Sequence, residues 1–212
     1  MARIVWSSLG SRRYETGLDR GVLYLTNGSG VPWSGLTSVQ DEPSSETASP
    51  SYFDGKKYFD FPGNSDFSGT INAITYPNEF LQFDGYALVN NGMYFANQIR
   101  NTFSLSYRTF VATDSNENYG YKIHIIYDLT ADPSSTISET LSDSVSIKEF
   151  SWKVYSRPSS YSGYSPVSHV VIDSTIMTAN ALTAIENKLY GTVSTSATLP
   201  TLTELYTLST TV

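Results

Sequence analysis

Alternation of apolar and polar side chains is the feature that most constrains the fold of this chain. Residues 103–108 read Phe, Ser, Leu, Ser, Tyr and Arg, and residues 121–129 place Tyr, Ile or Leu at every second position. A period of two puts alternate side chains on opposite faces of a β-strand. Ile126 interrupts the second pattern, so part of that strand's outer face is expected to be covered as well. Sixteen Tyr and ten Phe among 212 residues favour the same interpretation, because flat rings pack well on a pleated surface.

Further strands are predicted along much of the chain. They cover residues 22–25, 36–41, 67–76 and 169–174. A glycine-rich bend at residues 27–30 and a Pro32-Trp33 corner connect the first two of these strands. Asp54-Gly55, between two aromatic-rich runs, predicts a two-residue hairpin turn. Residues 145–155 change phase, and a β-bulge near Lys148–Glu149 would restore a single buried face.

One α-helix is predicted, from Thr178 to Tyr190. Thr178 can cap its first turn, and Gly191 stands just after its last turn, where a left-handed residue commonly ends a helix. The apolar stripe of this helix consists of Leu182, Ile185 and Leu189. Because a single amphipathic helix must cover an apolar surface, it is expected to pack on the sheet.

The C-terminal segment carries four leucines, spaced three residues apart from Leu199 to Leu208, but its many Thr and Ser residues weaken a helix prediction. We interpret it as an extended or short helical arm. Residues 1–212 show no internal repeat or domain boundary, so they are expected to form a single domain with an N-terminal and a C-terminal arm. The predicted fold is mainly β: a two-sheet β-sandwich or barrel with one flanking α-helix in the C-terminal half.

Patterns typical of catalysis or metal binding are weak. The chain has no cysteine, which excludes disulfides, thiolate catalysis and cysteine metal sites. His124 and His169 stand in strand patterns far apart in the sequence, and we interpret them as ordinary strand residues. Residues 114–120 resemble a calcium loop, but the glycine comes one position late and Ile125 stands where a bidentate Glu is needed. We therefore expect no catalytic residue, no cofactor and no metal ion.

The net charge of −7 makes the chain a poor candidate for binding nucleic acid, because phosphate contacts need Lys and Arg. An acidic surface would instead repel DNA. No apolar run reaches the roughly 20 residues that span a bilayer, and the N-terminus lacks the charged-then-apolar pattern of a signal peptide.

Eight short motifs follow one another in a fixed order. They are Gly21–Leu25, Gly30–Val39, Tyr52–Tyr58, Thr75–Phe80, Gly120–Tyr127, Phe150–Trp152, Ile172–Ser174 and Leu189–Thr192. In this order they resemble the major tail tube proteins of long-tailed, siphovirus-type phages that infect actinobacteria. The resemblance implies a structural virion protein rather than an enzyme, with a two-sheet β-sandwich and a flanking helix.

That resemblance also implies an assembly. Subunits would form hexameric rings whose inner sheets join into one barrel, and the rings would stack into a tail tube that conducts DNA at ejection. The implied partners are further copies of the chain, tape-measure protein, tail terminator and distal tail proteins, with DNA passing only transiently and no membrane. The protein would be assembled in the host cytoplasm and reside in the virion tail.

Candidate positions follow from this expectation. A tube that conducts DNA without holding it is expected to have a net negative interior, since like charge prevents adhesion. The residues that would face such a lumen are Asp41, Asp60, Asp66, Thr70, Asn72 and Asp128. The alternative is that the acids all lie outside and serve solubility. The polar loop Asp41–Ser51 is the candidate for contacts between subunits or rings, and its candidate residues are Glu42, Pro43, Ser44, Ser45, Glu46 and Thr47.

A second class of function stays open. Aromatic side chains in Tyr155–Tyr164 could stack on sugars. The rival hypothesis is therefore an acidic β-sandwich that acts as a carbohydrate-binding module. Rings or tubes in electron micrographs would favour the tail tube protein, and dispersed monomers that bind sugar would favour the rival.

Overall fold

The computed structural model describes residues 9–10, 12–42, 44–45, 49–54, 56–61, 65–132, 138, 140 and 147–211. At residues 44–45, 49–53, 57–61 and 65–66 the description covers the backbone and not the side chains.

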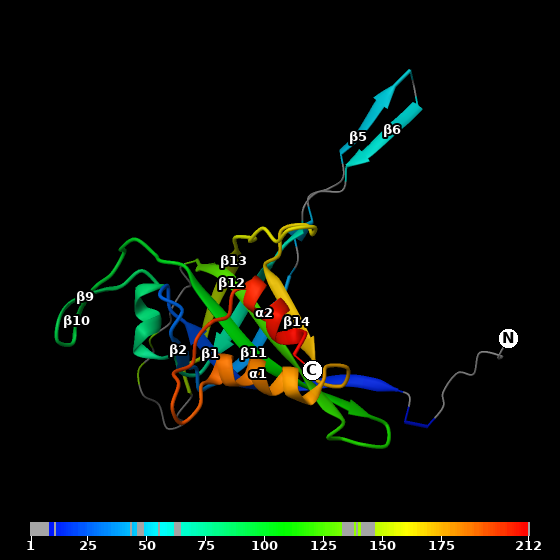
Figure 1. The fold of residues 1–212 in the computed structure, drawn as a ribbon. Helices are drawn as coiled ribbons and strands as arrows, with labels where there is room; N and C mark the ends of the chain where they lie inside the picture. The colour runs from blue at the N-terminus through cyan, green and yellow to red at the C-terminus, as the bar shows by residue number, and fades with distance from the viewer. Residues whose placement is uncertain are drawn as a thin grey trace.

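The described part of the chain is mainly β, with an eight-stranded antiparallel sheet as its body (Figure 1). Its strands follow the order β2-β1-β11-β12-β13-β8-β3, and β14 also pairs with β12. Their bounds are β1 Arg13–Tyr24, β2 Gly30–Pro32, β3 Leu36–Asp41, β8 Ser68–Ala73, β11 Phe103–Thr113, β12 Gly120–Ala131, β13 Phe150–Ser156 and β14 His169–Asp173.

Shorter elements surround this sheet. Three two-stranded pairs are β4 Ser44–Ser45 with β7 Ser65–Asp66, β5 Ser49–Phe53 with β6 Lys56–Phe61, and β9 Ala87–Asn90 with β10 Met93–Phe95. The helices are the 3-10 helix η1 Asn78–Gln82 and the α-helices α1 Ala179–Tyr190 and α2 Leu202–Ser209. None of the helices in the described residues is long and apolar enough to cross a membrane.

Strand β12 divides the sheet into two layers. Its residues Lys122–Ile126 pair with β14, whereas Leu129–Ala131 pair with β13. Asp128 lies between the two stretches and has a left-handed φ of 48°, which marks the bend. One layer is therefore β1-β11-β12-β14, and the other is β13-β8-β3. The two layers are also connected beside β1. There the Trp33 amide donates to the Gly21 carbonyl at 2.8 Å and joins β1 to the Pro32-Trp33 corner that leads into β3.

A large aromatic cluster fills the space between the two layers. Trp152 of β13, Trp33 of the corner and Phe80 of η1 are almost fully buried there. Their ring centroids lie 4.7–5.9 Å apart in tilted or edge-on contacts, the arrangement that aromatic quadrupoles favour. The Trp33 indole Nε1 donates to the Thr75 carbonyl at 2.9 Å, so its polar atom is satisfied. Ile126 also belongs to this cluster and is fully buried, which confirms that its face of β12 is covered.

The two α-helices cover the other face of the β1-β11-β12-β14 layer (Figure 1). Ile185 and Leu189 of α1 are buried against Ile123 and Ile125 of β12, and Leu182 packs partly buried beside them. Buried tyrosines connect this sheet layer to the helical segments through their hydroxyls. The Tyr24 hydroxyl donates to the Leu189 carbonyl at 2.9 Å, and that of Tyr127 donates to the Pro200 carbonyl at 2.9 Å. The predicted sandwich with a flanking helix is thus confirmed.

Helix α1 has the predicted ends. The Thr178 side chain accepts from the Ala181 amide, and Gly191 follows with a φ of 78°. In the C-terminal segment, expected to be an extended or short helical arm, the structure has the second alternative, the short helix α2. A capping box between Thr201 and Glu204 starts α2, and Leu205 is buried on its inner side. These contacts offset the weak helix propensity of its Thr and Ser residues.

The predictions of a hairpin turn and of a β-bulge have different outcomes. Phe53 pairs with Lys56, and Asp54 has a φ of 51°, so the two-residue turn is confirmed. The β-bulge predicted near Lys148–Glu149 is wrong, because β13 begins at Phe150 and residues 147–149 are not part of a strand. The phase change marks the start of the strand, and the earlier residues 141–146 lie outside the described part of the chain.

Candidate assembly interface

The outer edge of β1 is open near its N-terminal end. Within the described residues β1 pairs with β11 along one side, and with β2 only at Val22–Tyr24 on the other. The Asp114 amide donates to the Arg12 carbonyl at 3.3 Å. Because backbone groups alternate in direction along an antiparallel strand, Arg13 and Glu15 direct their N–H and C=O groups away from β11, toward this edge.

Strand β14 presents a second open edge on the same layer. The Tyr127 amide donates to the Ser168 carbonyl at 2.9 Å, and the Ser174 amide donates to the Tyr121 carbonyl at 3.0 Å. The same alternation then turns the N–H and C=O groups of His169 and Val171 away from β12. Within the described residues β14 pairs with β12 alone, and Val171 is 48% exposed. The layer β1-β11-β12-β14 therefore ends in unpaired backbone on both sides.

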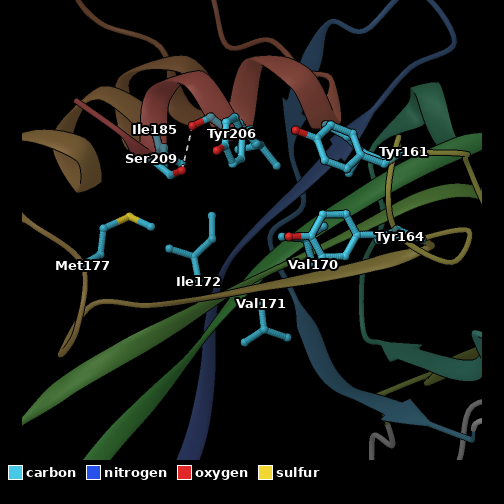
Figure 2. A pocket seen from close by; sticks show the side chains of 12 residues that line it. Tyr161, Tyr164, Val170, Val171, Ile172, Met177, Ile185, Tyr206 and Ser209 are labelled. Carbon is cyan, nitrogen blue, oxygen red and sulfur yellow. Dashed lines mark hydrogen bonds between the residues drawn. The ribbon is translucent and has the colours of Figure 1, made fainter.

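An apolar groove of about 320 Å³ runs beside the β14 edge, on the helix side of the sheet (Figure 2). Its floor is formed by Val170 and Ile172 of β14, and its sides include Met177, Tyr164 and Tyr206. The other lining residues are Tyr161, Val167, Val171, Ile185, Leu202, Leu205 and Ser209. Figure 2 shows the Val171 side chain on the opposite side of β14 from that of Ile172. Tyr164 and Tyr206 are 72% and 59% exposed.

A chain of polar side chains crosses the opposite face of this layer. Nδ1 of His124 lies 3.1 Å from Nε2 of His169, and Nε2 of His124 lies 3.1 Å from the Thr109 hydroxyl. Nδ1 of His169 lies 3.7 Å from Oδ2 of Asp41 on β3. The Tyr107 ring stacks on His124 with ring centroids 4.7 Å apart. The two histidines, interpreted from the sequence as isolated strand residues, thus form one pair, a correction that follows from the β12–β14 register.

Burial sets the protonation of this pair. Burial, together with the positive charge of a protonated His169, lowers the pKa of His124 to about 4. Burial also lowers the pKa of His169, while the Asp41 carboxylate opposes that shift. Near neutral pH both rings are therefore uncharged and share one hydrogen bond. Among the described residues no group of three or more His, Cys, Asp or Glu side chains is placed to hold a metal ion.

The described candidates for a lumen do not share one face. Thr70 and Asn72 point away from the core on β8, in alternation with buried Ile71, and Asn72 Nδ2 donates to the Ser38 hydroxyl at 2.9 Å. Asp41 points the other way, toward His169. Asp128 lies at the bend of β12, where its carboxylate accepts from the Ser159 hydroxyl at 3.4 Å.

The other two lumen candidates belong to short strands. Asp60 lies in β6 and Asp66 lies in β7, where the structure describes the backbone and not the side chains. Strand parity within one segment could not relate β3, β8 and β12 to one another, because that relation depends on the long-range pairing of the strands.

The predicted assembly loop is partly strand. Ser44 and Ser45 form β4 and pair with Asp66 and Ser65 of β7, and the Glu42 amide donates to the Ser68 carbonyl at 2.7 Å. Pro43, Glu46 and Thr47 lie outside the described residues. Beyond β4 and β7 the β5–β6 hairpin extends away from the body of the molecule (Figure 1).

Comparisons with known proteins add a structural similarity. No protein-family model and no curated protein matches the chain. Among solved structures, the chain is similar to a chain from the cryo-EM structure of an extracellular contractile injection system, the PVC sheath–tube complex in its extended state. The two share 12% sequence identity over 73% of this chain and 88% of that chain, with a TM-score of 0.34.

Proposed function

We propose that this chain is a structural, self-assembling tube protein and not an enzyme. The observation that carries the proposal is the pair of open edges, on β1 and β14, at the two ends of one four-stranded layer. Exposed strand edges invite pairing with another chain, and soluble proteins normally protect them. Here the open edge of β14 in one copy could pair with the open edge of β1 in another copy, so the function of both edges would be assembly.

The direction of the strands favours a closed ring. Successive strands of β1-β11-β12-β14 are antiparallel, so β1 and β14 run in opposite directions. A rotation about the axis of a ring keeps the direction in which each strand runs along that axis. The β14 strand of one copy would therefore lie antiparallel to the β1 strand of the next copy. Such a head-to-tail contact repeats until the rotation closes into a ring. Each copy would then contribute four strands to one continuous barrel.

The finer assignment rests on the sequence resemblance to actinophage tail tube proteins. In this assignment six copies form a ring, rings stack into the tail tube, and the tube conducts DNA from the virion without binding it specifically. The tape-measure, terminator and distal tail proteins are its partners, and the protein is assembled in the host cytoplasm. The net charge of −7 fits a lumen that repels phosphate.

A proline at position 171 tests the proposed contact. The Val171 N–H points outward, so Val171→Pro removes an edge donor without removing a bond to β12. We expect a folded monomer that forms neither rings nor tubes in negative-stain micrographs, under conditions in which the wild type assembles. Val171→Thr is the matched control, since it keeps the N–H and should assemble. Normal tubes from Val171→Pro would show that the β14 edge is not part of the contact between copies.

The carbohydrate-binding module remains the second candidate, because Tyr161, Tyr164 and Tyr206 cluster beside the groove. Ring centroids of Tyr161 lie 5.8 Å from Tyr164 and 6.2 Å from Tyr206. Exposed aromatic faces of this kind can stack on sugar rings. A wild-type protein that stays monomeric at high concentration and binds glycans would favour this candidate over the tube protein.

A further inference from the structure

The groove beside β14 has a shape and position that suit a specific occupant. It is apolar, it is bordered by the open edge of β14, and it lies on the helix side of the sheet. Any strand that paired with this edge would direct every second side chain over the groove. The identity of those side chains follows from the β1 edge, and the inference therefore rests on the proposed function.

The parity of β1 determines which of its side chains face the helices. Thr16 pairs with Phe110, and Phe110 pairs with Tyr121, whose hydroxyl donates to Glu186 of α1 at 2.7 Å. Thr16 therefore lies on the helix side, and so does Tyr14, two residues earlier. Arg13 and Glu15 lie on the opposite side, where Glu15 forms an ion pair with Lys122.

The hydrogen-bonding pattern of the two edges is compatible with this parity. In an antiparallel pair, residues that exchange bonds face each other and their side chains share one face of the sheet. Glu15 of β1 and Val171 of β14 both direct their backbone groups outward, and both side chains lie on the face away from the helices. Tyr14 would then stand opposite Ile172, on the floor of the groove.

Charge selects this register over its neighbours. Placing Glu15 opposite Val171 also places Arg13 opposite Asp173, so opposite charges meet across the contact. A shift by two residues in one direction would place Glu15 opposite Asp173, and like charges directly opposite one another are destabilising. A shift by two residues in the other direction would place Arg13 opposite Val171 and lose the pair of opposite charges. A shift by one residue would reverse the faces of all the side chains.

We propose that the groove between β14, α1 and α2 receives Tyr14 from the Arg13–Thr16 segment of a second copy of this chain. Tyr14 is 50% exposed in the single chain, so it is available for such a contact. Tyrosine is typical of the residues that dominate interface energies, because a rigid ring buries a large area and its hydroxyl can stay solvated. The contact would fix the register of each ring junction.

Truncation of Tyr14 tests the side-chain contact. We expect Tyr14→Ala to raise the protein concentration needed for assembly by ~10-fold or more, while Tyr14→Phe, which keeps the ring, assembles nearly as well as the wild type. Tyr94→Ala, at a 40% exposed tyrosine on β10, is the control and should change nothing. Equal assembly of Tyr14→Ala and the wild type would overturn the proposal.

Engineered cysteines test the register directly, because the natural chain has none. In the proposed register Thr16 of one copy lies opposite Val170 of the next copy. The two residues form a non-hydrogen-bonded pair, because the backbone groups of each bond within its own copy. The side chains of such a pair approach closely. The double variant Thr16→Cys/Val170→Cys should form a ladder of disulfide-linked multimers on oxidation, ending at the size of the ring. Each single variant should give dimers at most.

The outcomes separate this inference from the proposed function. If the wild type forms rings or tubes but the double variant gives no ladder and Tyr14→Ala assembles normally, the groove contact is wrong and the tube protein stands. If the wild type never assembles, both fail. If the groove binds sugar and Tyr14→Ala has no effect, the carbohydrate-binding module replaces both.

Discussion

At the scale of single residues, the His124–His169 pair makes stability depend on pH. Asp41 and Glu15 face the pair and favour protonation, whereas burial and Lys122 oppose it, and the net result lowers the pKa of His124 from 6.5 to about 4. Between pH 6.5 and 4, His124 is protonated in the unfolded chain but stays neutral in the folded chain. The contribution of this group to stability is therefore fully present above pH 6.5 and is lost as the pH drops toward 4, by less than the ~3 kcal/mol of an unscreened shift because solvent reaches the partly exposed ring.

Chemical denaturation between pH 7.5 and 4 measures this loss. His124→Gln removes the titrating group, and its stability should fall less steeply than that of the wild type over the same interval. The two proteins differ at this one titrating position, so the difference between their curves reports the contribution of His124. Parallel curves for the two proteins would contradict the effect of burial on His124.

At the scale of elements, α1 is a packing element. Ile185 is 1% exposed and lies in the cluster that joins α1 to β12 and β14. Truncation of a buried Ile to Ala typically costs roughly 2–5 kcal/mol, because it removes apolar contacts and leaves a cavity. Ile185→Ala should therefore lower the melting temperature of the unassembled subunit. Asn187→Ala, on the exposed side of the same helix, is the control, and equal melting temperatures of both variants would show that α1 is not held by this stripe.

The elements also show how far the sequence predicts this structure. The strands at 103–108 and 121–129, the Asp54-Gly55 turn and helix α1 are predictable, because side-chain period, turn residues and caps are local signals. Helix α2 had a local signal as well, the Thr201–Glu204 capping box. The pairing of β12 with β14 had none, because strand pairing is set by contacts across the whole chain. The histidine pair and the groove follow from that pairing and were therefore missed.

At the scale of the whole molecule, the β5–β6 hairpin and the sheet edges would serve two separate levels of the proposed assembly. The edges of β1 and β14 belong to the body of the molecule, whereas the hairpin extends away from it (Figure 1). In the proposed assembly, a contact between edges acts within a ring. A projection that leaves the body is suited to reach a neighbouring ring, which is the role proposed for the region that follows Asp41.

The β4–β7 pair offers a place to remove the hairpin cleanly. Ser45 pairs with Ser65, so the backbone enters and leaves the hairpin at neighbouring positions. Replacing residues 46–64 by Asn-Gly would close the two strands with a two-residue turn that matches their twist. Because β1, β14 and the groove are untouched, this variant should fold and form rings, and rings should not stack into tubes in negative-stain micrographs. The Thr16→Cys/Val170→Cys ladder should persist in the shortened chain, which separates lost stacking from lost ring closure. Normal tubes from the shortened chain would show that stacking depends on other surfaces.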